Sequence, residues 1–177
     1  ILVYVDVIFP SFISNVPLLY IIFFSYVELI NPPFIINLES FNTAVVTNMA
    51  NMFKDCIVLS NLNINNFTTS NVTDMQGMFE NCSVLNPINL DHFSTSSVKY
   101  FNNMFKGCNS ITNLVLNHFV TNNALDMKYM FDNCTNLTTL NISQFITDKV
   151  IDMQYMFNDC HALTNLSLPT TMNTAQV

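Results

Sequence analysis

The chain has 177 residues, of which 50% are hydrophobic, enough for one domain with a sizeable core. Only 10% are charged: five lysines, no arginine and twelve acids give a net charge of −7. This balance argues against binding a nucleic-acid backbone or an anionic membrane surface, since both need clustered lysine or arginine.

Residues 1–31 differ in pattern from the rest of the chain. Positions 7–27 carry no charge and are numerous enough to cross a bilayer, but two prolines interrupt them and no basic residue precedes Lys54. Counting back the repeat of the later chain places apolar side chains on core positions: Tyr20, Phe23, Tyr26, Val27 and Ile30. We favour a degenerate repeat that caps an array. A trimmed signal or anchor segment is the alternative, and membrane contact is expected only through this segment.

Residues 32–168 form an array with a constant period. A lone cysteine recurs every 26 residues, as do a Met-Phe pair before it and an F-x-T motif. No insertion or deletion interrupts the spacing. The period lies within the roughly 20–29 residues of leucine-rich repeats, so a solenoid of stacked coils is predicted. Residues 169–177 are then a C-terminal tail or a truncated next repeat.

Each repeat begins with an alternating apolar pattern. Leu62 and Ile64 flank the polar Asn63, and such a period of two predicts a short strand with the aliphatic side chains facing inward. Stacked coils place these strands in a parallel sheet. Ile36 is expected to begin the sheet, and the later strands are expected to centre on Leu62, Ile88, Leu114, Leu140 and Leu166.

The second half of each repeat predicts a helix. In the type unit its apolar residues stand at offsets 0, 3, 6, 7 and 10, which is one helical face: Val72, Met75, Met78, Phe79 and Cys82. Asp74, Asp126 and Asp152 fall in the first turn, where acids favour the helix dipole. The predicted fold class is α/β, a leucine-rich-repeat solenoid of 26-residue strand–loop–helix coils with a parallel sheet on one face.

The residue before each cysteine indicates where this helix ends. It is always glycine, asparagine or aspartate, the types that tolerate the left-handed backbone of a helix C-terminus: Asp55, Asn81, Gly107, Asn133 and Asp159.

The cysteines are interpreted as core residues. There is one per coil, an odd total, with no C-x-x-C and no histidine at ligand spacing. A buried column of reduced thiols is the favoured prediction. A disulfide between neighbouring coils is the alternative, because strand spacing of roughly 4.8 Å falls within the Cα separation of bridged cysteines.

No constellation of catalytic residues stands out. His92 and His118 share a position in adjacent coils, but no third metal ligand keeps that column. Asp126 and Asp152 are interpreted as helix-dipole partners, not as an acid–base pair. We expect no catalytic residue, cofactor or metal, and no enzyme.

Two exposed positions of the repeat form columns of polar side chains along the stack. Charges alternate in the column after each Met-Phe pair, so neighbouring coils can form ion pairs: Lys54, Glu80, Lys106, Asp132 and Asn158. The sheet face carries an uncharged strip of amides and hydroxyls, which we take as the candidate binding face: Asn61, Asn63, Asn89, Asn113, Thr139 and Asn141. It is either an asparagine ladder that satisfies itself by stacking or a contact surface for a protein or glycan.

The unit FTTSNVTDMQGMFENCSVLNPINL resembles the repeats of BspA-like leucine-rich-repeat surface proteins, which follow V-T-x-M-x-x-M-F-x-x-C-x-x-L-x-x-L. The resemblance covers residues 41–168, with phenylalanine where that family often has tryptophan. It implies a bacterial or protist protein, without cofactor or enzymatic activity, used in adhesion or host interaction at the cell surface or after secretion.

Three functions are therefore open. The first is a surface-exposed module that binds a protein or glycan on a cell or matrix surface. The second is an intracellular protein-interaction scaffold built on the same solenoid. The third is a binding array attached to an enzyme that lies outside this sequence.

Overall fold

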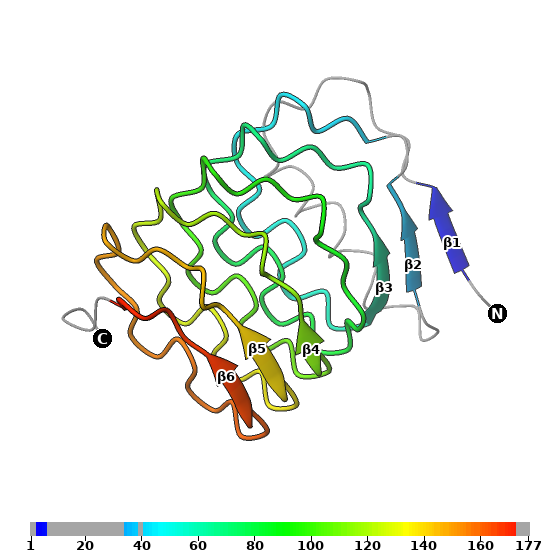
Figure 1. The fold of residues 1–177 in the computed structure, drawn as a ribbon. Helices are drawn as coiled ribbons and strands as arrows, with labels where there is room; N and C mark the ends of the chain where they lie inside the picture. Colours follow the sequence, from blue (N-terminus) through cyan, green and yellow to red (C-terminus); the bar gives the residue numbers. More distant parts are fainter. Residues whose placement is uncertain (1–2, 7–33, 39–40, 173–177) are drawn as a thin grey trace.

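The computed structural model describes residues 3–6, 34–38 and 41–172, in which successive coils stack and short strands line one side (Figure 1). The described residues contain no helix. Their strands are β1 (Val3–Asp6), β2 (Phe34–Asn37), β3 (Leu59–Asn63), β4 (Asn113–Leu114), β5 (Thr139–Asn141) and β6 (Asn165–Ser167).

The strands pair in parallel, one coil with the next. They form two three-stranded sheets in the orders β1-β2-β3 and β4-β5-β6. Leu114 is the register partner of Leu140, which is the partner of Leu166, and Ile36 is the partner of Leu62. The predicted parallel pairing is therefore confirmed at these five positions. The expected inward face is confirmed for Leu62, Leu114 and Leu140 but is wrong for Leu166, which is 37% exposed in the last described coil.

Two details of the sheet prediction are wrong. No strand forms around Ile88, because Pro87 occupies the place of Asn113 and has no N–H to donate to a neighbouring strand. The sheet also begins one strand before Ile36, since Val5 of β1 is its partner.

The N-terminal segment is described only at β1. The uncharged stretch 7–27 and its five proposed core positions, Tyr20, Phe23, Tyr26, Val27 and Ile30, lie outside the described residues. In the part of the chain that is described, no helix has the length and hydropathy that a membrane span requires.

The predicted helix is wrong, and a series of tight turns replaces it. The N–H groups of Met75, Gly77 and Phe79 donate to carbonyl groups of the next coil at 2.9–3.0 Å. The N–H groups of Met78 and Glu80, which follow Gly77 and Phe79 in the sequence, donate three residues back within the turns, at 3.2 and 3.1 Å. An α-helix would direct every N–H along its own axis and leave none for the neighbouring coil. We call the segments 48–56, 74–82, 100–108, 126–134 and 152–160 the turn segments.

Left-handed residues recur twice in each turn segment. The predicted column before the cysteines is confirmed, with φ between 56° and 71°: Asp55, Asn81, Gly107, Asn133 and Asp159. A second column lies four residues earlier, at φ 57–58°: Asn51, Gly77, Asn103, Tyr129 and Tyr155. Two such residues within one turn segment interrupt any helix, so they serve the turns and do not mark a helix end.

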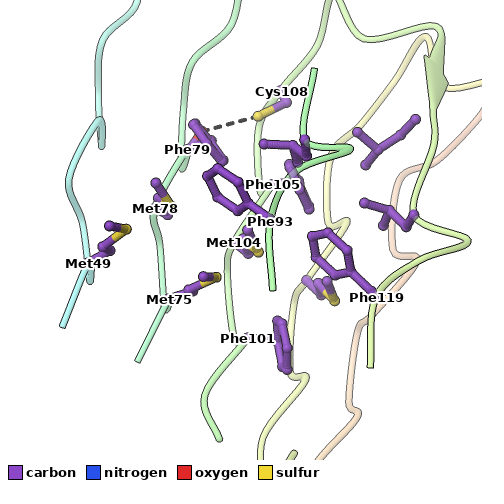
Figure 2. Close-up of a cluster of buried hydrophobic side chains, with 14 of the residues drawn as sticks. Met49, Met75, Met78, Phe79, Phe93, Phe101, Met104, Phe105, Cys108 and Phe119 are labelled. Atoms are coloured by element: carbon purple, nitrogen blue, oxygen red, sulfur yellow. Dashed lines mark hydrogen bonds between the residues drawn. The ribbon is translucent and has the colours of Figure 1, made fainter. Parts of the chain in front are cut away.

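The core is built of identical slots, as Figure 2 shows for its central part. Phe79, Phe105 and Phe131 are fully buried, and their rings stack at centroid distances of 5.7 and 5.8 Å. The methionines before them, the cysteines after them and the strand leucines fill the same cluster. The predicted inward face of the Met-Phe-Cys pattern is therefore correct, although the backbone that carries it is not helical.

Candidate functional site

The six residues of the candidate binding face are all exposed: Asn61, Asn63, Asn89, Asn113, Thr139 and Asn141. On β3, β4 and β5 they alternate with buried leucines, so the strands turn them outward. Asn113 and Thr139 are direct register partners. Asn89 lies in the coil without a strand, between β3 and β4. The structure thus brings all six to the outer side of the strand-bearing wall.

Three of these asparagines share one local geometry. The Oδ1 atom of Asn63 accepts a hydrogen bond from the N–H of Asn65, at 3.2 Å, and the pattern repeats one and three coils later. Asn89 accepts from Asp91 at 2.9 Å, and Asn141 accepts from Ser143 at 3.0 Å. We call Asn63, Asn89 and Asn141 the amide column. The interpretation as a self-stacking ladder is wrong for them, because each caps the turn after its own strand position.

From β3 to β6 the rest of the outward strand surface is neutral. Val115, which is 51% exposed, and Ser167 occupy the position of the amide column in their coils. Pro87 is also exposed, between the coils of Asn61 and Asn113. Specific contact here therefore depends on hydrogen bonds and shape, not on ion pairing.

The cysteines are structural thiols. The Sγ of Cys108 donates to the carbonyl oxygen of Phe79 at 3.1 Å, one coil earlier, and Cys82, Cys134 and Cys160 repeat the contact at 3.0–3.1 Å. Burial raises the pKa of the Cys108 thiol to about 12. Since the thiolate is the nucleophile and the metal ligand, these groups are held in their inert form. The predicted burial is confirmed for four cysteines, and Cys160 is partly exposed.

Three residues of the histidine column bond to the previous coil, whereas the buried Nε2 of His92 has no hydrogen-bond partner among the described residues. His118 Nε2 lies 2.8 Å from the carbonyl oxygen of Leu90, and Gln144 Nε2 in the next coil donates to Leu116 at 2.7 Å. Asn66 makes the same contact to Leu38 at 2.9 Å. Within the described ranges, no three histidine, cysteine, aspartate or glutamate side chains gather as metal ligands would.

Sequence reasoning missed the role of the repeated threonines. The buried Thr95 Oγ1 donates to the carbonyl oxygen of Val120 at 3.0 Å and accepts from the N–H of the same residue at 2.8 Å. Thr69 and Thr121 bind the next coil in the same way. A hydroxyl that recurs at a buried position was the available signal, because a buried polar group needs a partner.

The predicted ion pairs form between coils. Lys54 lies 2.9 Å from Glu80, and Lys106 lies 3.0 Å from Asp132. Asn158 extends the column by donating to Asp132 at 2.8 Å. The alternating charges therefore do pair along the stack, as their order predicts.

The expectation that Asp74, Asp126 and Asp152 begin a helix is wrong. Each carboxylate oxygen accepts the N–H two residues later, at 2.9–3.0 Å, and so caps the first turn of a turn segment. Burial raises the pKa of Asp126, and the neighbouring Asp152 raises it further, while the hydrogen bond to the N–H of Lys128 opposes both effects. These acids are turn caps.

Comparison with known proteins identifies a family but no activity. Residues 23–139 match the family described as "Mycoplasma protein of unknown function, DUF285", and residues 81–177 match it a second time. No curated protein and no solved structure matches the chain significantly. The tandem matches agree with the repeated coils. Because the first match alone covers more than half of the sequence, the chain belongs to the DUF285 family.

Proposed function

We propose that this chain is a non-enzymatic binding module that contacts a protein or glycan through its candidate binding face. One observation carries the proposal: six exposed amide and hydroxyl side chains lie on the outer side of the stacked coils from β3 to β5. Three of them are held by a hydrogen bond to their own turn, and polar groups that are already held in place lose less conformational entropy when they bind.

The state of the reactive side chains supports a non-enzymatic role. The thiols of Cys82, Cys108 and Cys134 are buried and bonded to backbone carbonyl groups, and a ring nitrogen of His118 is bonded in the same manner. Catalysis needs a nucleophile or base that can reach a substrate. These groups instead form hydrogen bonds between neighbouring coils.

The setting that we propose is the cell surface or the extracellular medium, with adhesion as the role. Support comes from the resemblance to BspA-like leucine-rich-repeat surface proteins and from the tandem match to a repeat-containing family. A stack of coils also suits adhesion because many weak contacts along its length add up.

A blocking experiment tests the face. The double variant Asn113→Trp with Thr139→Trp places two bulky rings on β4 and β5 without removing any turn cap. It is expected to abolish binding to immobilised cell-surface or matrix material while the melting temperature changes little. The matched control is Val120→Trp with Ile146→Trp, because these side chains are each 42% exposed and also lie one period apart, but off the strands. If the Asn113 and Thr139 variant bound as well as the control variant, the candidate binding face would be excluded as the contact surface.

An intracellular interaction scaffold is the second proposal, and one observation favours it. All five cysteines are free, whereas exported proteins commonly pair theirs in disulfides. Fractionating the source cells and probing intact cells with an antibody separates the two proposals. Signal on intact cells supports the adhesion role, and signal only after lysis supports the scaffold.

A further inference from the structure

The turn caps of the amide column decide which end of each side chain faces outward. A carboxamide has one acceptor oxygen and one donor NH₂ group. In Asn63, Asn89 and Asn141 the oxygen accepts a backbone N–H two residues later, at 3.2, 2.9 and 3.0 Å. No group in the described part of the chain engages the three Nδ2 atoms. The column therefore presents NH₂ donors to a ligand, in an orientation that the backbone imposes.

A second column of caps shows that the cap alone does not require asparagine. At the start of the turn segments, Asn48 Oδ1 accepts the N–H of Ala50 at 2.7 Å. In later coils Asp74, Asp126 and Asp152 fill the same position and accept the same kind of bond at 2.9–3.0 Å. Amide and carboxylate thus cap these turns equally well. From β3 to β6 the position of the amide column holds no acid, so what distinguishes Asn63, Asn89 and Asn141 there is the NH₂ group.

We propose that the amide column is a row of hydrogen-bond donors for an uncharged glycan. This inference rests on the proposed function and names its ligand. The hydroxyl and ring oxygens of a neutral sugar supply the acceptors that the donors need. Anionic ligands are disfavoured, because the chain carries a net charge of −7 and the outward strand positions hold no lysine.

The apolar neighbours of the column suit the same ligand. Val115 is 51% exposed in the column itself, and Pro87 is exposed beside Asn89. Both can pack against the C–H surface of a sugar ring. A bound peptide strand would instead seek unpaired backbone at a sheet edge. Here the donors belong to side chains on the face.

The spacing of the donors suits a polymer. Asn63 and Asn89 lie in adjacent coils, and Asn141 lies two coils further along. Adjacent parallel strands are about 4.8 Å apart, so the column offers donors at multiples of one short repeat. Each contact is weak, and affinity should therefore grow with chain length of the glycan.

The test replaces the donors and keeps the caps. Asn63→Asp, Asn89→Asp and Asn141→Asp are combined, and binding to immobilised mannan, dextran and galactan is compared with binding to a polyuronate. The unchanged chain is expected to bind at least one neutral polysaccharide with little salt dependence. The triple variant should bind it about tenfold or more weakly, since three neutral hydrogen bonds are lost. Asn48→Asp is the matched control, with an identical atomic change at the other cap column, and should bind normally.

A second variant guards against misfolding. Serine occupies this position naturally at Ser167 and also caps turns, so the triple serine variant replaces each NH₂ group by a shorter side chain with one hydroxyl donor, without adding charge. Unchanged binding by both triple variants would overturn the inference, as would binding to the polyuronate alone or to no polysaccharide. Loss of binding in the tryptophan variant of Asn113 and Thr139, with normal binding by both triple variants, would keep the proposed function and remove only the donor assignment. Binding to matrix protein but to no glycan would likewise keep the proposed function and remove the glycan as its ligand.

Discussion

The thiol of Cys134 donates a hydrogen bond to the backbone carbonyl oxygen of Phe105, with 3.1 Å between sulfur and oxygen, across the boundary between two coils. The contact repeats at Cys82, Cys108 and Cys160. A side chain that usually suggests reactivity is here part of the stacking interface. Its recurrence every 26 residues reflects one structural requirement met once per coil.

Thiol labelling should follow this burial. We expect Cys160, which is partly exposed in the last described coil, to react first with a maleimide probe. Cys82, Cys108 and Cys134 should react only after denaturation, because the probe cannot reach them and their protonated form is favoured. Mass spectrometry of a labelling time course measures this. Labelling of Cys108 as fast as Cys160 in the native protein would contradict the assignment.

Stability should fall at alkaline pH. Burial raises the pKa of Cys108 from 9.0 to about 12 and raises that of Cys134 as well. At a pH between the pKa of the unfolded thiol and that of the folded thiol, the unfolded chain has lost a proton that the folded chain still holds. The free energy of unfolding therefore decreases as pH rises. We expect the denaturant midpoint to decline from about pH 9 upward because of this proton difference.

Other groups also titrate in that range, so a variant isolates the thiols. Cys108→Ala removes one of the shifted groups and should flatten the decline, although it lowers stability at about pH 7 by leaving a small cavity. A slope between about pH 9 and pH 11 that is identical in Cys108→Ala and the unchanged chain would show that this thiol does not contribute.

The buried threonines should matter through their hydroxyl groups. Thr95→Val keeps the shape of the side chain but leaves the N–H and the carbonyl oxygen of Val120 without their partner. The expected cost is about 1–3 kcal/mol of the free energy of unfolding. Thr95→Ser keeps the hydroxyl and should cost less. Denaturant titrations compare the two variants, and an equal loss in both would assign the effect to packing.

A side chain at Gly77 should be destabilising, although the other four coils carry one at the equivalent position. Its φ is 57°, and a methyl group there would collide with the Asn51 side chain of the previous coil. Gly77→Ala should therefore destabilise the chain by more than about 1 kcal/mol, as denaturant titration would measure. Asn103→Gly, at φ 58° in the same column, is the control and should be neutral or stabilising. A neutral Gly77→Ala would show that the turn can rearrange.

The exposure of the candidate binding face was predictable, but the orientation of its amide groups was not. Alternation around Leu62 and Leu140 indicates which side chains of β3 and β5 face outward, because side chains of a strand alternate between its two faces. The cap that turns Asn63 Oδ1 toward Asn65 depends on how the chain leaves the strand. The turn after the strand sets this course of the chain, and the alternating pattern of the strand does not predict the turn.

The period, the parallel pairing and the core residues of the inner coils were predictable from the sequence, whereas Leu166 and Leu168 of the last described coil were expected in the core and are exposed. Identical spacing of Phe79, Phe105 and Phe131 already requires equivalent places in successive coils. The backbone of the turn segments, in contrast, depends on contacts between coils. The offsets of Met75, Met78 and Phe79 fit a helix and a series of turns equally well, since both bring these side chains to one face. The backbone N–H groups can bond within the segment or to the next coil. A next coil follows the turn segments 48–56, 74–82, 100–108 and 126–134, and about half of their N–H groups bond across to it.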